Sequence, residues 1–151
     1  MKKIFLFLAP MLIMTIAYGC SKDHQAPTFS KYEDFFNKRK PQNLIASFTK
    51  SKDEFNLVWD MSDTNSVEMY FVAWSDSNVF DLGKQGDEYT NSLKLSYTLN
   101  ATRVLKSMGY IAPKDSFIVY FTVSAVCDTT GLFKEFSGPR SAVDSALVYR
   151  K

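Results

Sequence analysis

Nucleophilic or acid–base chemistry usually needs a histidine or a reactive cysteine at a fixed position, and this chain offers few of either. Its 151 residues include one histidine, His24, and two cysteines, Cys20 and Cys127. His24 lies in a polar N-terminal stretch without apolar periodicity, so a catalytic Ser-His or Cys-His pair is not expected there. Cys127 ends an apolar run, which favours a buried thiol over a nucleophile. The sequence therefore predicts no catalytic residue and no enzymatic activity.

Oxygen ligands are also poorly arranged for a metal ion. Asp60, Asp63 and Asn65 crowd one segment, and Asp76 and Asp81 another. A calcium loop supplies about six to eight oxygens in a fixed order with a glycine and a terminal glutamate, and neither segment has that order. Turn formation explains both groups of residues. Glycine-rich phosphate loops and paired CxxC motifs are absent from the sequence, so neither a metal nor a cofactor is expected.

The first 19 residues have the pattern of a secretory signal. Lys2 and Lys3 precede an apolar run over residues 4–16, and Gly19 stands directly before Cys20. A basic start, a short apolar centre and a small residue before the cleavage point define such a signal. The apolar run is shorter than the roughly 20 residues that a membrane-spanning helix needs. We therefore expect residues 1–19 to be removed, leaving Cys20 as the first residue of the mature chain.

A cysteine directly after such a signal resembles the lipobox of bacterial lipoproteins, whose cysteine thiol is diacylated before cleavage. The resemblance implies that Cys20 is lipidated and that its acyl chains anchor the protein in the outer membrane, because each buried methylene contributes about 0.8 kcal/mol. The alternative is an ordinary free thiol in a secreted protein. Ser21-Lys22-Asp23 resembles the charged residues that follow the acylated cysteine in surface-displayed lipoproteins of Bacteroidetes. That likeness implies display on the outside of the cell.

The composition excludes several classes of protein. The chain is 46% hydrophobic and 23% charged with a formal net charge of +2, which excludes a disordered chain and an electrostatic nucleic-acid binder. Residues 20–42 read as the lipidated N-terminus and a tether. Phe29, Tyr32 and Phe36 are spaced for a short amphipathic helix over residues 31–39. We expect a solvated tether with a few aromatic side chains docked on the domain; the alternative is a helix that lies on the membrane surface or binds a partner.

From residue 43 to residue 151 the pattern changes to short strands separated by turns. Phe55, Leu57 and Trp59 alternate, and the odd-numbered residues from Phe117 to Cys127 form one apolar face of the longest strand. One helix interrupts the series over residues 98–108, with Thr98 as N-cap and Gly109 at the left-handed C-terminal position. Several strands without βαβ alternation predict an all-β antiparallel sandwich. The other expected segments are strands over 44–49, 67–74, 93–97 and 141–149, a short edge strand over 79–82, a polar loop over 83–91 and a turn around Phe133 and Phe136.

The domain carries a series of apolar and turn motifs in this order: Leu57-Val58-Trp59, Tyr70-Phe71-Val72, Tyr97-Thr98-Leu99-Asn100 with Leu105 and Met108-Gly109, Phe121-Thr122-Val123-Ser124-Ala125 and Ser137-Gly138-Pro139-Arg140-Ser141. Their order resembles the N-terminal domain of SusE-type outer-membrane lipoproteins of Bacteroidetes. The likeness covers roughly residues 44–148 and implies a fibronectin type III or immunoglobulin-like sandwich with a helix inserted before the penultimate long strand. SusE-type proteins are accessory lipoproteins of glycan-uptake systems, and their sugar binding resides in additional C-terminal domains, so the resemblance transfers no binding residue.

Aromatic side chains supply the candidate contact residues. Trp59 alternates with two apolar neighbours and is expected in the core. Trp74 at a strand end, Tyr89 in a polar loop, and Phe133 and Phe136 in a turn are the candidates for contact with a ligand or partner. We expect a non-enzymatic cell-envelope lipoprotein, held to the membrane by N-terminal acyl chains, that binds other outer-membrane proteins. The alternative is a glycan-binding accessory protein of a polysaccharide-uptake system.

Overall fold

The structure is a computed structural model that describes residues 29–110, 116–129 and 133–149. The chain divides into two compact units, Met1–Lys31 and Tyr32–Lys151. The expected signal sequence, Cys20 and His24 lie outside the described residues. Within the described ranges, no helix has both the length and the apolar character needed to cross a membrane.

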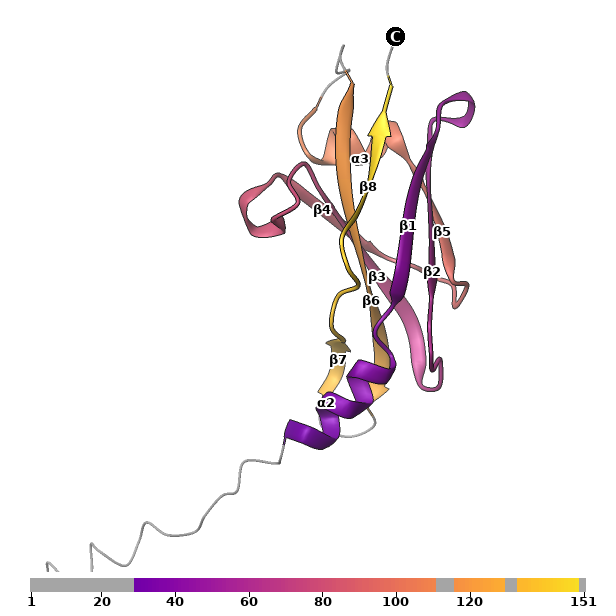
Figure 1. Cartoon of the computed structure of the whole chain (residues 1–151), viewed down its shortest axis with the longest axis vertical. Coiled ribbons are helices and arrows are strands. Elements are labelled where there is room, and N and C mark those ends of the chain that lie inside the picture. Colours follow the sequence, from indigo (N-terminus) through magenta and orange to yellow (C-terminus); the bar gives the residue numbers. More distant parts are fainter. Residues whose placement is uncertain (1–28, 111–115, 130–132, 150–151) are drawn as a thin grey trace, which may run out of the picture. The chain divides into compact units, whose positions relative to one another are not determined.

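The described strands form two antiparallel sheets (Figure 1), which confirms the predicted all-β sandwich. One sheet has three strands in the order β1-β2-β5, and the other has five, in which β8 also pairs with β6. The three-stranded sheet contains β1 (Gln42–Thr49), β2 (Glu54–Asp60) and β5 (Ser96–Asn100). The five-stranded sheet contains β4 (Gln85–Tyr89), β3 (Val67–Ser75), β6 (Phe117–Thr129), β7 (Phe133–Ser137) and β8 (Asp144–Val148).

The inner faces of the two sheets enclose one hydrophobic core. On β2, Phe55, Leu57 and Trp59 are all buried, as their alternation predicts. The Phe55 ring packs against that of Phe121 on β6 with centroids 4.9 Å apart, and Trp59 packs against Tyr70 on β3 at 5.0 Å. Burial of each such side chain contributes about 1.5–3 kcal/mol before entropy is counted. The odd-numbered residues of β6 from Val119 to Cys127 are also buried, which confirms the predicted apolar face.

The helix α3 (Ala101–Ser107) covers one edge of the sandwich, between β5 and β4. The side chain of Asn100 accepts a hydrogen bond from the Arg103 N–H at 2.9 Å, so Asn100 is the N-cap. The expected start at residue 98 was wrong because Thr98 still belongs to β5, where it pairs with Asn56. Gly109 has a φ of 82°, which confirms the left-handed residue expected after the helix.

At the opposite edge, β1 lies beside β8. The Ala46 N–H on this outer strand donates to Asp144 Oδ2 at 2.7 Å, so a side chain of the other sheet occupies a backbone donor that would otherwise be open. Occupied edge groups protect a sandwich from pairing with other strands.

Three expected segments differ from the observed ones. Residues 80–82 form a 3-10 turn, η2 (Phe80–Leu82), where the sequence predicted an edge strand. The expected polar loop over 83–91 contains β4, which forms by pairing with β3 even though it includes Gly86 and two acidic residues. Residues 133–137 form β7 where a turn was expected, because they extend the ladder of β6. In the last two cases long-range pairing outweighs local preference.

The helix α2 (Phe29–Lys38) precedes the sandwich and covers most of residues 31–39, where the spacing of the aromatic residues allowed a short helix. Phe35 and Phe36 pack against the core. The buried Arg39 forms an ion pair with Asp63 at 2.8 Å and donates to the carbonyl oxygens of Asn65 at 2.6 Å and Phe35 at 2.9 Å. Its guanidinium carbon also lies 3.7 Å from the Phe35 ring centroid. Arg39 therefore fastens the end of α2 to the turn between β2 and β3.

Replacing Arg39 with methionine tests this attachment. Arg39→Met keeps the aliphatic stem but leaves Asp63 unpaired and two carbonyl groups without donors. We expect the free energy of unfolding to fall by about 1–3 kcal/mol in urea denaturation, whereas Lys38→Met at the neighbouring exposed position changes it by less than about 0.5 kcal/mol. Equal stabilities for the two variants would contradict the attachment.

Candidate functional site

The four candidate contact residues have different environments. Trp74 is only 3% exposed, so it belongs to the core and is withdrawn as a surface contact. Its indole N–H donates to Ser107 Oγ on α3 at 2.9 Å. Gly86 on β4 makes room for the ring, since a Cβ at that position would lie 2.4 Å from the indole nitrogen. Phe133 and Phe136 lie on β7, where the side chains are outside the described part of the structure.

Tyr89 is the candidate that the structure leaves on the surface, with 54% of the residue exposed. It is the cross-strand partner of Phe71, and the two rings lie 5.1 Å apart. Gln85 and Asp87 are also exposed on β4 at alternate positions, so they share a face with Tyr89. This strand therefore presents an aromatic ring, a carboxylate and an amide side by side, a combination that can stack on an apolar surface and hydrogen-bond beside it.

A second exposed feature, which the sequence analysis missed, is the β3–β4 loop of residues 76–84. Leu82 is 82% exposed and Val79 is 49% exposed, whereas Phe80 between them is buried. The Arg140 guanidinium carbon lies 5.5 Å from the Phe80 ring centroid. Residues 79–82 look like a short apolar strand in the sequence. The flanking Ser, Asp, Asn and Gly residues were the signal that could have indicated a loop.

Hydrogen bonds hold this loop in one conformation. The Val79 N–H donates to Ser77 Oγ at 3.1 Å, and the Leu82 N–H donates to the Val79 carbonyl at 3.0 Å. At the base of the loop, the Lys84 N–H donates to Asp76 Oδ1 at 2.8 Å, and the Asp76 N–H donates to the Lys84 carbonyl at 3.2 Å. A loop ordered before binding loses less conformational entropy when a partner covers it. The loop therefore presents Val79 and Leu82 on a pre-organised support.

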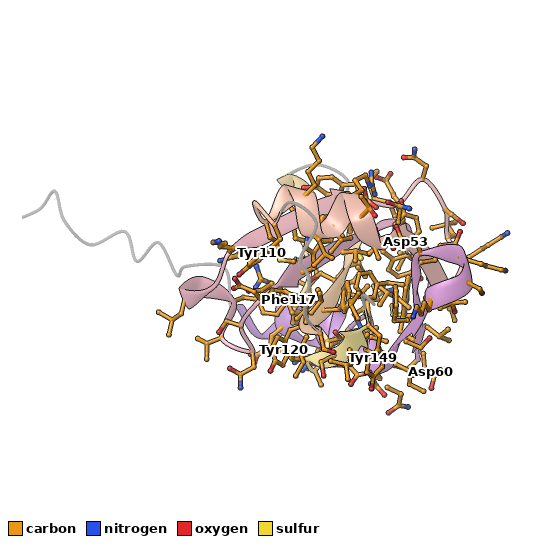
Figure 2. All side chains as sticks on the ribbon, turned by 90° about the horizontal axis from the view of Figure 1, so that it is seen from above. Asp53, Asp60, Tyr110, Phe117, Tyr120 and Tyr149 are labelled. Atoms are coloured by element: carbon orange, nitrogen blue, oxygen red, sulfur yellow. The ribbon has the colours of Figure 1, made fainter. Side chains whose placement is uncertain are left out.

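Tyr110 connects this loop to the core. Its hydroxyl donates to Asp76 Oδ2 at 2.6 Å, and its ring centroid lies 4.4 Å from that of Phe117. Tyr110 and Phe117 are labelled in Figure 2. Lys84 Nζ lies 4.3 Å from the Tyr110 ring centroid. The hydrogen bond to the Asp76 carboxylate raises the pKa of Tyr110 above its ordinary value of 10.0, and burial adds to the effect.

An ion pair between α3 and β4 lies near Tyr97 of β5. Arg103 Nη2 lies 2.5 Å from Glu88 Oε2, and Arg103 is largely exposed. Burial, and then the neighbouring Glu88, raise the pKa of Tyr97.

Cys127 is buried, as expected, and burial raises the pKa of its thiol. In the described part of the chain, no three His, Cys, Asp or Glu side chains come together as metal ligands.

The Tyr110–Asp76 hydrogen bond predicts a pH dependence. Because the folded-state pKa of Tyr110 is raised, its contribution to stability is fully present below pH about 10 and is lost as the pH rises through the folded-state value. In an absorbance titration of phenolate, Asp76→Asn should move one tyrosine transition to lower pH, while Glu68→Gln at an exposed site should not. Superimposable curves for wild type and Asp76→Asn would show that this hydrogen bond is not formed.

No protein-family model and no curated protein matches the chain. Among solved structures, it is similar to the fn3 domain of human contactin 1, with 16% identity over 74% of this chain and 77% of that chain and a TM-score of 0.50. It is also similar to a Fn3-like protein from Clostridium thermocellum, with 23% identity over 74% and 92% of the two chains and a TM-score of 0.44. The likeness to contactin 1 supports a fibronectin type III-like fold.

Proposed function

We propose that the protein is a non-enzymatic, lipid-anchored module of the cell envelope that binds another envelope protein through its β3–β4 loop. The observation that carries the proposal is the exposure of Leu82 and Val79 on a loop fixed by hydrogen bonds. Aliphatic side chains of this kind fill apolar pockets on proteins, where burying each one contributes about 1.5–3 kcal/mol. They offer neither a flat ring nor a polar group to a sugar.

The membrane anchor in this proposal is Cys20, which follows the expected signal sequence. Its acyl chains would hold the protein in the outer membrane, and the charged residues after Cys20 favour display on the cell exterior. The resemblance to SusE-type lipoproteins supports the same location. The absence of a second histidine from the sequence and the burial of Cys127 support a binding role over a catalytic one.

Fatty-acid labelling tests the anchor. Cells that express the full chain and grow with a radioactive fatty acid should yield a labelled protein in the membrane fraction. Cys20→Ala should remove the label, because the acylated thiol is gone, whereas Cys127→Ala should retain it as the matched control. An unlabelled wild-type protein would exclude the lipoprotein assignment.

A glycan-binding accessory role is the second candidate. The exposed Tyr89 ring on Phe71, with Asp87 and Gln85 on the same face of β4, is the observation that favours it. A ring that stacks on a sugar and adjacent groups that accept or donate hydrogen bonds are the elements such a site needs.

Two measurements on matched variants separate these functions. Affinity electrophoresis against a panel of polysaccharides should show no retardation of the full chain. A photoreactive residue in place of Leu82 should form a covalent adduct with one envelope protein in cells, and Val79→Asp should abolish that adduct. The same residue in place of exposed Ile118 should form none. Retardation that Tyr89→Ala removes and Leu82→Ala leaves intact would replace the protein-binding proposal with the glycan one.

A further inference from the structure

The structure describes three arginine side chains, and they differ in their partners. Arg39 forms an ion pair with Asp63, and Arg103 forms one with Glu88. Arg140 is exposed, and no carboxylate of the described residues lies within ion-pair distance of it. A guanidinium is charged at every physiological pH and presents five N–H donors in one plane. Arg140 therefore offers its charge and its donors to solvent or to a partner.

The backbone on both sides of Arg140 is fixed to β6. The Gly138 N–H donates to the Ala125 carbonyl at 2.8 Å. The Ser141 N–H donates to the Val123 carbonyl at 2.8 Å, and the Val123 N–H donates in return to Ser141 Oγ at 3.0 Å. A residue on a fixed backbone loses less conformational entropy when a partner binds it. The position from which the Arg140 side chain extends is therefore set before any partner arrives.

The β3–β4 loop meets Arg140 on the outward face of the five-stranded sheet. Phe80 is buried, but it is not part of the hydrophobic cluster between the two sheets. The side chain of Gln85, which is exposed on the outward face of β4, donates to the Phe80 carbonyl oxygen. Arg140 approaches the Phe80 ring from the connection between β7 and β8, and the strand order places β3 and β6 between that connection and β4. The loop is therefore held from both sides of the sheet.

The contact with Phe80 brings a cation without an ion pair close to the exposed aliphatic side chains of the loop. Val79 and Leu82 are one and two residues from Phe80. Because consecutive Cα atoms are about 3.8 Å apart, the Cα atoms of both lie within about 8 Å of that of Phe80. The carboxylate of Asp76 at the base of the loop already accepts two hydrogen bonds. The loop therefore presents apolar side chains beside a positive charge that Asp76 does not neutralise.

We infer that the Arg140 guanidinium binds a carboxylate of the partner protein, beside the apolar surface that receives Leu82 and Val79. A carboxylate accepts two parallel hydrogen bonds from the planar donors of a guanidinium. A guanidinium is also more weakly hydrated than an ammonium group, so covering it beside apolar groups costs less free energy. The inference rests on the proposed function, because it names the chemistry of the partner at the same loop. The partner must therefore present an Asp or Glu next to apolar residues.

Charge variants of Arg140 test this contact in cells. The full chain carries the photoreactive residue in place of Leu82, and the yield of the covalent adduct is measured. Arg140→Glu should lower the yield about tenfold, because it sets two carboxylates against each other, whereas Arg140→Lys should retain most of it. Lys94→Glu, at an exposed position beyond the other end of β4, should leave the yield unchanged. A yield that Arg140→Glu does not lower would overturn this inference alone, and no adduct from the chain with Arg140 intact would overturn the proposed function with it.

A charge exchange separates a direct contact from a structural role of Arg140 in the loop. Mass spectrometry of the adduct identifies the cross-linked peptide of the partner, and each Asp or Glu near the cross-linked residue is changed to Lys in turn. One of these changes should lower the yield with Arg140 and restore it with Arg140→Glu, because the two charges have exchanged places. Failure of every such change to restore the adduct, in a partner that remains folded, would overturn the inference, since a disturbed loop cannot be repaired from the partner.

Discussion

The packing of aromatic side chains between the two sheets is the interaction on which the other features depend. Phe55 and Trp59 from one sheet meet Phe121 and Tyr70 from the other, with centroid separations of 4.9 and 5.0 Å. Rings of this size account for much of the apolar area that a small domain can bury. Because these rings lie in the core, they are unavailable to a ligand at the surface.

A core formed by two sheets also requires that their open edges be covered. α3 covers the edge between β4 and β5, and its Ser107 receives the indole N–H of Trp74. At the opposite edge Asp144 accepts the Ala46 N–H. Arg39 joins the end of α2 to the turn after β2 through Asp63. Each contact joins residues from separate elements, so the edges and the N-terminal helix are fixed together with the core.

Three exposed features of the domain differ in chemistry. The β3–β4 loop presents aliphatic side chains, β4 presents Tyr89 beside polar groups, and the three-stranded sheet presents the exposed pair Ile45 and Val58. Aliphatic side chains of this kind are complementary to apolar surfaces, whereas a ring beside hydrogen-bonding groups is complementary to a surface that is partly polar. These features lie on different elements, so each can be changed without altering the others.

Features set by local alternation were predictable from the sequence. The buried faces of β2 and β6 follow from Phe55 to Trp59 and from Val119 to Cys127, and Gly109 takes the left-handed conformation that its position after the helix requires. Features set by distant partners were not predictable. β4 forms because it pairs with β3, Trp74 is buried because Gly86 and Ser107 receive it, and Arg39 meets Asp63 across 24 positions of sequence. The exposed loop was missed for the same reason, since burial of Phe80 depends on its tertiary surroundings.

Acrylamide quenching of tryptophan fluorescence tests the packed sandwich most directly, because Trp59 and Trp74 are both buried. In Trp74→Phe, which leaves Trp59 as the single emitter, the account predicts a blue-shifted emission maximum and quenching well below that of the same chain in denaturant. Emission at the wavelength of free indole, with equal quenching in native and denaturing buffer, would contradict a core built from these rings.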